Sequence, residues 1–130
     1  MKRLTSTLEK LNIDRPEEKA ETLMAYMDGI LKANENVNLT AITEREEFID
    51  KHIIDSLLAI SSSEVKNAKN IIDMGTGGGF PGVPLAVAFP AKEFLLVDSL
   101  NKRIKIIEEL CERIGIKNVR AVHGRAEEMA

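Results

Sequence analysis

The chain has 130 residues, of which 44% are hydrophobic and 30% charged, and its formal net charge is −3 at pH 7. This composition is that of a globular domain, or the front part of a larger one, and excludes a disordered chain. A single cysteine, Cys111, excludes an internal disulfide framework, and the short apolar runs predict no transmembrane helix and no secretory signal. We therefore expect a reduced, cytoplasmic setting, and neither half of the chain is basic enough to indicate a nucleic-acid partner.

The first 68 residues are predicted to form a helical region. Leucines at positions 4, 8 and 11 have helical spacing and predict a short amphipathic helix. A second helix is predicted to begin after Asp14, which would cap it, with Pro16 in its first turn. Its apolar stripe comprises Ala20, Leu23, Met24, Met27, Ile30 and Leu31.

A loop rich in asparagine, residues 34–40, separates this helix from a third one. Thr43 and Glu46 have the spacing of a capping box at the start of that helix. The apolar side of the third helix comprises Phe48, His52, Ile53, Leu57 and Ile60. A run of serines at 61–63 is predicted to end it.

From residue 69 onward the pattern indicates strands alternating with helices. Apolar runs predict three strands, at 71–73, 94–97 and 118–122. A helix is predicted after Pro81, and a stronger one, with Cys111 on its buried face, is predicted to end at a left-handed Gly115. The sequence thus predicts an α/β fold in which a helical region, 1–68, precedes a Rossmann-like βαβαβ unit, 69–130.

The loop after the first predicted strand is the strongest functional signal. Five of the eight residues from 75 to 82 are glycine. Glycines let a ligand approach the backbone closely, and the helix that follows offers free N–H groups. We expect a nucleoside-containing ligand at the carboxyl ends of the strands. The alternative is a turn whose glycines only satisfy backbone geometry.

Two classes of ligand fit this loop. The glycines at 77, 79 and 82 match the dinucleotide fingerprint, which would make the chain part of an NAD-type oxidoreductase. The residues of the first methyltransferase motif are equally present: Asp73, Gly75, Gly77 and Gly79. Asp73 favours S-adenosylmethionine, because its carboxylate can face the ligand's ammonium group but would repel a pyrophosphate.

The ends of the second and third strands supply further candidates. We expect Asp98 or Ser99 to bind the ribose hydroxyls, and Asp98 can also cap the helix that follows. The stretch 124–127 is placed either to contact the adenine or to begin another helix. No metal site is predicted.

Five motifs, in this order and spacing, resemble one bacterial family: Asn38–Ile42, His52–Leu57, Asp73–Gly82, Val97–Arg103 and Arg125–Glu128. This is the glucose-inhibited division protein B family, also called ribosomal RNA small subunit methyltransferase G. Its members methylate guanine N7 in 16S ribosomal RNA. The resemblance extends from about residue 30 to the end of the chain.

The resemblance implies a Rossmann-like enzyme that uses S-adenosylmethionine and modifies a guanine in the helix 18 loop of 16S rRNA. By position, the family's cofactor contacts fall on Gly75, Phe80, Ala126 and Glu127, with Asp98 near the ribose. Guanine N7 has an exposed lone pair and need not lose a proton before it attacks, so no catalytic base is predicted. We expect no membrane or DNA partner, and a monomer at full length.

The family is considerably longer than this chain. We therefore expect a fragment or early-terminated form that binds cofactor weakly and turns over little. Its first strand would be left at the edge of the sheet, where it is an aggregation hazard. A non-catalytic cofactor-binding or assembly module is the third interpretation.

Other polar residues are given structural roles. His52 and Asp55 are expected to brace the helices against the sheet rather than line a cleft, and Cys111 is expected in the core. Lys102, Arg103 and Lys105 are expected on a solvated face, with phosphate contact as the alternative.

Overall fold

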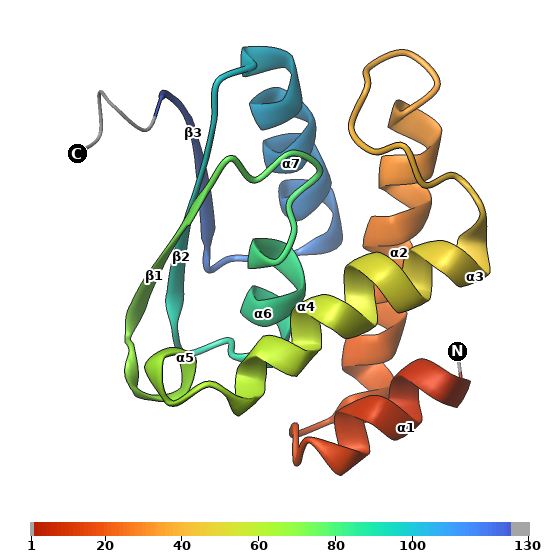
Figure 1. Ribbon diagram of the computed structural model, residues 1–130, viewed down its shortest axis with the longest axis vertical. Helices are drawn as coiled ribbons and strands as arrows, with labels where there is room; N and C mark the ends of the chain where they lie inside the picture. The colour runs from red at the N-terminus through yellow and green to blue at the C-terminus, as the bar shows by residue number, and fades with distance from the viewer. Residues whose placement is uncertain (1, 126–130) are drawn as a thin grey trace.

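The computed structural model describes residues 2–125. It contains a parallel three-stranded sheet in the order β1-β2-β3, formed by Asn70–Met74, Glu93–Asp98 and Val119–His123. Figure 1 shows α6 (Gly82–Ala88) and α7 (Asn101–Ile114) on one face of this sheet. The predicted βαβαβ unit is therefore confirmed, and Gly115 ends α7 with a positive φ of 96°.

The parallel register brings the carboxyl ends of the strands together, with Asp98 of β2 paired to His123 of β3. β1 is an edge strand, as predicted, and it is covered on one face only. The Asp73 side chain contacts α6, so the neighbouring Ile72 and Met74 point to the opposite face, where they are 60% and 41% exposed.

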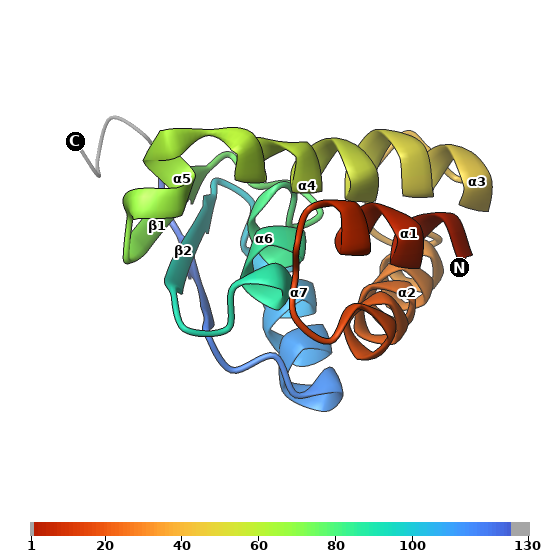
Figure 2. The same ribbon diagram turned by 90° about the horizontal axis from the view of Figure 1, so that it is seen from below.

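The N-terminal helices lie beyond α6 and α7, away from the sheet. α1 (Lys2–Lys10) buries Leu4 and Leu8, and α2 (Pro16–Ala33) packs along α6 and α7. A further helical segment, residues 45–61, crosses α1 and α2 (Figure 2). It consists of α3 (Arg45–Phe48), a π-helical turn (Ile49–Ile54), α4 (Asp55–Leu58) and a 3₁₀ turn (Ala59–Ser61).

The predicted caps of α2 and α3 are both wrong by one residue. Arg15, in the left-handed conformation, stands at the N-cap of α2, and no side chain caps that helix. Pro16 is its first residue, as predicted. At α3 the Glu44 carboxylate, not the Thr43 hydroxyl, accepts hydrogen bonds from the amides of Glu46 and Glu47. Capping depends on the φ and ψ of one residue, which a residue pattern does not specify.

The third predicted helix is confirmed as a helical segment, but not as a continuous α-helix. The π-helical turn changes its periodicity, so Ile49 joins the buried side while His52 lies half-buried at its margin. The serine run does not simply end the segment. The Ser62 hydroxyl accepts a bond from the Glu64 amide and caps a short helix that was not predicted, α5 (Ser63–Asn67).

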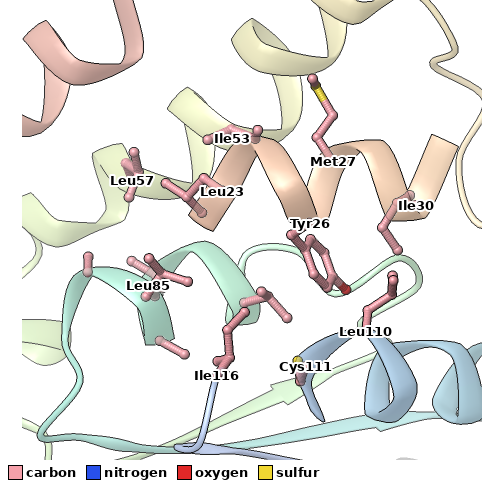
Figure 3. Packing of buried hydrophobic residues seen from close by; sticks show 14 of the residues in the cluster. Leu23, Tyr26, Met27, Ile30, Ile53, Leu57, Leu85, Leu110, Cys111 and Ile116 are labelled. Carbon is pink, nitrogen blue, oxygen red and sulfur yellow. The ribbon is translucent and has the colours of Figure 1, made fainter. Parts of the chain in front are cut away.

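One hydrophobic core joins the helices to the sheet unit. It includes Leu23 and Met27 of α2, Leu57 of α4, and Leu110 and Cys111 of α7 (Figure 3). The predicted core position of Cys111 is confirmed by its 4% exposure.

The division of the chain into two regions at residue 68 stays a prediction. Over residues 2–125, no helix has both the length and the hydropathy that a bilayer crossing requires.

Candidate cofactor-binding site

The glycine loop folds back over the end of β2. The amides of Gly75 and Thr76 both donate to the carbonyl oxygen of Val97, at 2.8 and 3.0 Å. Gly75 and Gly77 have positive φ values of 69° and 58°, which the missing Cβ permits. The backbone around these two glycines is thereby held at the carboxyl edge of the sheet, where ligands of open α/β folds bind.

Asp73 fixes the two ends of this loop to each other. Its Oδ2 accepts a hydrogen bond from the Thr76 hydroxyl at 2.7 Å and another from the Gly82 amide at 3.0 Å. Among the described residues, no donor is bonded to Oδ1. Burial raises the pKa of Asp73, and the two hydrogen bonds partly offset that rise. Oδ1 is therefore available to a ligand, while Oδ2 accepts a hydrogen bond from the first amide of α6.

Asp98 joins the loop to the start of α7, and its side chain is only 4% exposed. Its Oδ2 accepts from the Gly77 amide at 2.9 Å, and its Oδ1 accepts from the Leu100 amide at 2.9 Å. Leu100 is the N-cap of α7, and no side chain caps that helix. The predicted capping role of Asp98 is therefore wrong, because its carboxylate is bonded to the amide that precedes the helix and not to one inside it.

Arg103 is a part of the site that the sequence analysis placed wrongly. Lys102 and Lys105 are exposed as expected, but the Arg103 side chain is only 24% exposed. Its Nε donates to the Asn38 carbonyl oxygen at 3.0 Å, and Nη1 lies 3.5 Å from Asp98. The asparagine-rich loop passes over the start of α7, a contact between segments 65 positions apart that no local pattern reveals.

An open cleft of about 520 Å³ lies at this edge of the sheet. It is lined by Met74, Gly75, Val97, Asp98, Ser99, Leu100, Arg103, Gly124 and Arg125. The structure thus brings together three of the predicted site residues, Gly75, Asp98 and Ser99. Two others, Ala126 and Glu127, lie outside the described residues. Their assignment, like that of the whole predicted set, stays a prediction.

The opposite side of the loop faces the helical region. Gly79, with φ 98°, and Phe80 lie on this side, not in the cleft. The Phe80 ring stacks on the His52 ring with centroids 4.6 Å apart and an interplanar angle of 10°. The Tyr26 hydroxyl donates to the Gly78 carbonyl oxygen at 2.7 Å. The His52 ring thus lies between the helices and the loop, not against the sheet as predicted, and Asp55, which was expected to share the bracing role, is exposed.

Sequence reasoning missed Tyr26, although a signal was present. Tyr26 lies three residues after Leu23 and next to Met27, within the apolar stripe of α2. Its hydroxyl needs a partner when buried, and the partner that it has in the structure belongs to a distant loop. His123, at the end of β3, is exposed, and its Nε2 lies 3.0 Å from the Ser99 carbonyl oxygen.

Comparison with known proteins identifies the family. The family model of GidB, rRNA small subunit methyltransferase G, matches residues 19–130. The chain belongs to this family. Its relatives called ribosomal RNA small subunit methyltransferase G include one from Lachnoclostridium phytofermentans, 48% identical over 123 residues, which are 95% of this chain and 51% of the relative. Another, from Clostridium perfringens (strain 13 / Type A), is 48% identical over 88% of this chain and 48% of the relative. The chain therefore spans about half the length of these relatives.

Solved structures confirm the fold prediction. A Klebsiella pneumoniae protein described as an O-methyltransferase matches 80% of this chain and 45% of its own, with a TM-score of 0.58 and 21% identity. Protein-L-isoaspartate O-methyltransferase matches 95% of this chain and 42% of its own, with a TM-score of 0.55 and 19% identity. Both likenesses indicate a Rossmann-like methyltransferase fold.

Proposed function

We propose that this chain forms the S-adenosylmethionine site of an enzyme that methylates N7 of a guanine in the helix 18 loop of 16S rRNA. Membership of the rRNA small subunit methyltransferase G family supports the substrate class. The observation that carries the cofactor assignment is Asp73, a half-buried carboxylate under a glycine loop, with Oδ2 bonded and no described donor on Oδ1.

The described residues fit the cofactor group by group. The Oδ1 of Asp73 would accept from the ammonium of the methionine part, a charge-assisted bond. Asp98 and Ser99 would bind the ribose hydroxyls, and Gly75 would lie against the cofactor because it carries no Cβ. We propose that Gly77, Gly79 and Phe80 contribute to cofactor binding as parts of the same loop. We propose Ala126 and Glu127 as the adenine contacts.

The chemistry requires alignment more than acid–base groups. The cofactor supplies a methyl group on a positively charged sulfur. The lone pair of guanine N7 forms the new bond to carbon as the bond to sulfur breaks, which leaves a neutral thioether and a positively charged base. No proton moves, so the protein has to hold the nucleophile, the methyl group and the sulfur in line. A loop RNA suits this reaction because an unstacked guanine exposes N7.

The residues at the start of α6 favour S-adenosylmethionine over a dinucleotide. A pyrophosphate binds to free amides at a helix N-terminus. Here the Gly82 amide, the first of α6, already donates to the Asp73 carboxylate, whose charge would repel a phosphate. We further propose that the enzyme acts as a monomer in the cytoplasm.

Calorimetry tests the cofactor assignment directly. The purified chain is titrated with S-adenosylhomocysteine and, separately, with NAD⁺. We expect measurable binding of S-adenosylhomocysteine and none of NAD⁺ at the same concentration. Binding of NAD⁺ as tight as, or tighter than, that of S-adenosylhomocysteine would overturn the proposal.

A second experiment tests the RNA substrate. The chain, extended to the length of its relatives, is incubated with helix 18 RNA and methyl-labelled S-adenosylmethionine, and the digested RNA is analysed for 7-methylguanosine. Transfer of label to that nucleoside is expected. Label found only on another base or another atom would refute the N7 assignment.

A further inference from the structure

Two side chains of the helical region hold the glycine loop from the side opposite the cleft. One is Tyr26 of α2, and the other is His52 of the π-helical turn. Neither residue lines the cleft. Their contacts fall on Gly78, Gly79 and Phe80, which begin three residues after Gly75, the loop residue that borders the cleft.

Tyr26 fixes the backbone of the loop. Its ring is 1% exposed, and its hydroxyl donates to the Gly78 carbonyl oxygen at 2.7 Å. A Cβ added at Gly79 would overlap the same hydroxyl, so the loop backbone lies directly against the tyrosine. A buried carbonyl that loses its donor is unfavourable, and the loop would move to recover one.

His52 fixes the side chain that ends the loop. Its ring lies parallel to Phe80 at 4.6 Å, and the edge of Phe48 packs against both rings, with centroids 4.8 and 5.3 Å away. The His52 Nε2 is hydrogen-bonded to the Thr40 hydroxyl at 2.6 Å. The Thr40 amide in turn donates to the Asn34 side chain at 3.0 Å, so the imidazole is held on both sides.

The cofactor-facing part of the loop depends on these anchors because it is so short. Thr76 binds Asp73, and Gly77 binds Asp98, while the next three residues are those held by the helices. We propose that Tyr26 and His52 are positioning residues, which hold the loop in the shape that presents Gly75 and Asp73 to the cofactor. This inference rests on the proposed S-adenosylmethionine site.

Three substitutions separate the two anchors. Tyr26→Phe removes only the hydroxyl and keeps the buried ring. His52→Ala removes the ring that stacks on Phe80, and His52→Phe restores a ring of similar shape without the bond to Thr40. Asn118→Ala is the control, because the Asn118 side chain donates to three carbonyl oxygens, those of Ala86, Phe89 and Lys92, and has no hydrogen bond to the loop within the described part of the chain.

Each variant is examined by hydrogen–deuterium exchange without ligand and by calorimetry with S-adenosylhomocysteine. We expect Tyr26→Phe and His52→Ala to increase amide exchange at 77–80 and to weaken binding about tenfold, the loss of one good interaction. His52→Phe should restore both values toward those of the wild type. Asn118→Ala should lower the melting temperature and leave loop exchange and affinity as in the wild type.

The inference is overturned if loop exchange in Tyr26→Phe and His52→Ala equals that of the wild type. It is also overturned if Asn118→Ala weakens binding as much as they do, because general destabilisation would then explain the loss. If the wild-type chain binds no S-adenosylhomocysteine, the proposed function fails instead. The exchange measurement then decides the positioning role by itself.

Discussion

Replacing Asp73 by asparagine separates the shape of its carboxylate from its charge. The asparagine carbonyl oxygen can take the place of Oδ2 and keep the bonds from the Thr76 hydroxyl and the Gly82 amide. The NH₂ group then occupies the place of Oδ1, where the cofactor ammonium is proposed to bind. The substitution therefore preserves the loop and replaces the ligand's acceptor by a donor.

The expected effects on stability and on binding have opposite signs. Burial raises the pKa of Asp73 above its ordinary value of 3.8, so the charged form costs folding free energy at neutral pH. Asp73→Asn should thus leave the chain at least as stable as the wild type at pH 7. The advantage should disappear as the pH falls below the raised pKa. Loss of a charge-assisted bond to the ammonium costs about 1.5–3 kcal/mol, or about 10- to 150-fold in Kd.

Calorimetry with two ligands isolates the ammonium contact. S-adenosylhomocysteine carries the amino group, and 5′-methylthioadenosine lacks the whole amino-acid end. Asp73→Asn should weaken the first and leave the second nearly unchanged. Glu93→Gln, the same chemical change at the exposed start of β2, is the matched control and should change neither. An equal loss for both ligands, or no loss for S-adenosylhomocysteine, would refute the role given to Asp73.

Four further predictions concern stability and reactivity. Gly115→Ala should lower the free energy of unfolding, measured in urea, by about 1–2 kcal/mol. The loss comes from the positive φ alone, because an added Cβ would meet no neighbouring atom. Gly79→Ala should cost at least about 1 kcal/mol more, since its Cβ overlaps the Tyr26 hydroxyl; equal costs would contradict this packing. Burial lowers the pKa of His52 below 6.5, so the unfolded chain binds more protons than the folded one just below that pH. The free energy of unfolding should therefore decrease as the pH falls through this range, and His52→Phe should reduce this pH dependence. Burial raises the pKa of Cys111 to about 12, so a disulfide reagent at pH 8 should label the thiol only in urea, and labelling of the native chain would show that the helix face opens.

The sequence was most informative where one local cause decides the structure. The apolar residues of β2 and β3 and the glycines of the loop predicted strand, turn and helix correctly, because strand patterning and backbone freedom act within a few residues. The end of α7 at Gly115 was predicted for the same reason, because a glycine in the left-handed conformation ends a helix through contacts with the preceding turn alone.

Prediction failed where the deciding contact is distant. The role of Arg103 depends on Asn38, and that of Tyr26 depends on Gly78, 52 positions away. The caps at Arg15 and Glu44 failed for another reason, because neighbouring polar residues compete and tertiary packing selects the backbone conformation. The predicted site therefore lies at the strand ends, where the structure has an open cleft, but the support of the loop by the helices was not predicted.

The bond between Tyr26 and the glycine loop also has a spectroscopic consequence. The sequence contains one tyrosine and no tryptophan, so the ultraviolet emission of the chain comes from the ring whose hydroxyl is bonded to Gly78. Fluorescence intensity and lifetime should therefore follow the separation of α2 from the loop without any attached dye. The chain carries its own optical probe at the junction between its helices and its candidate site.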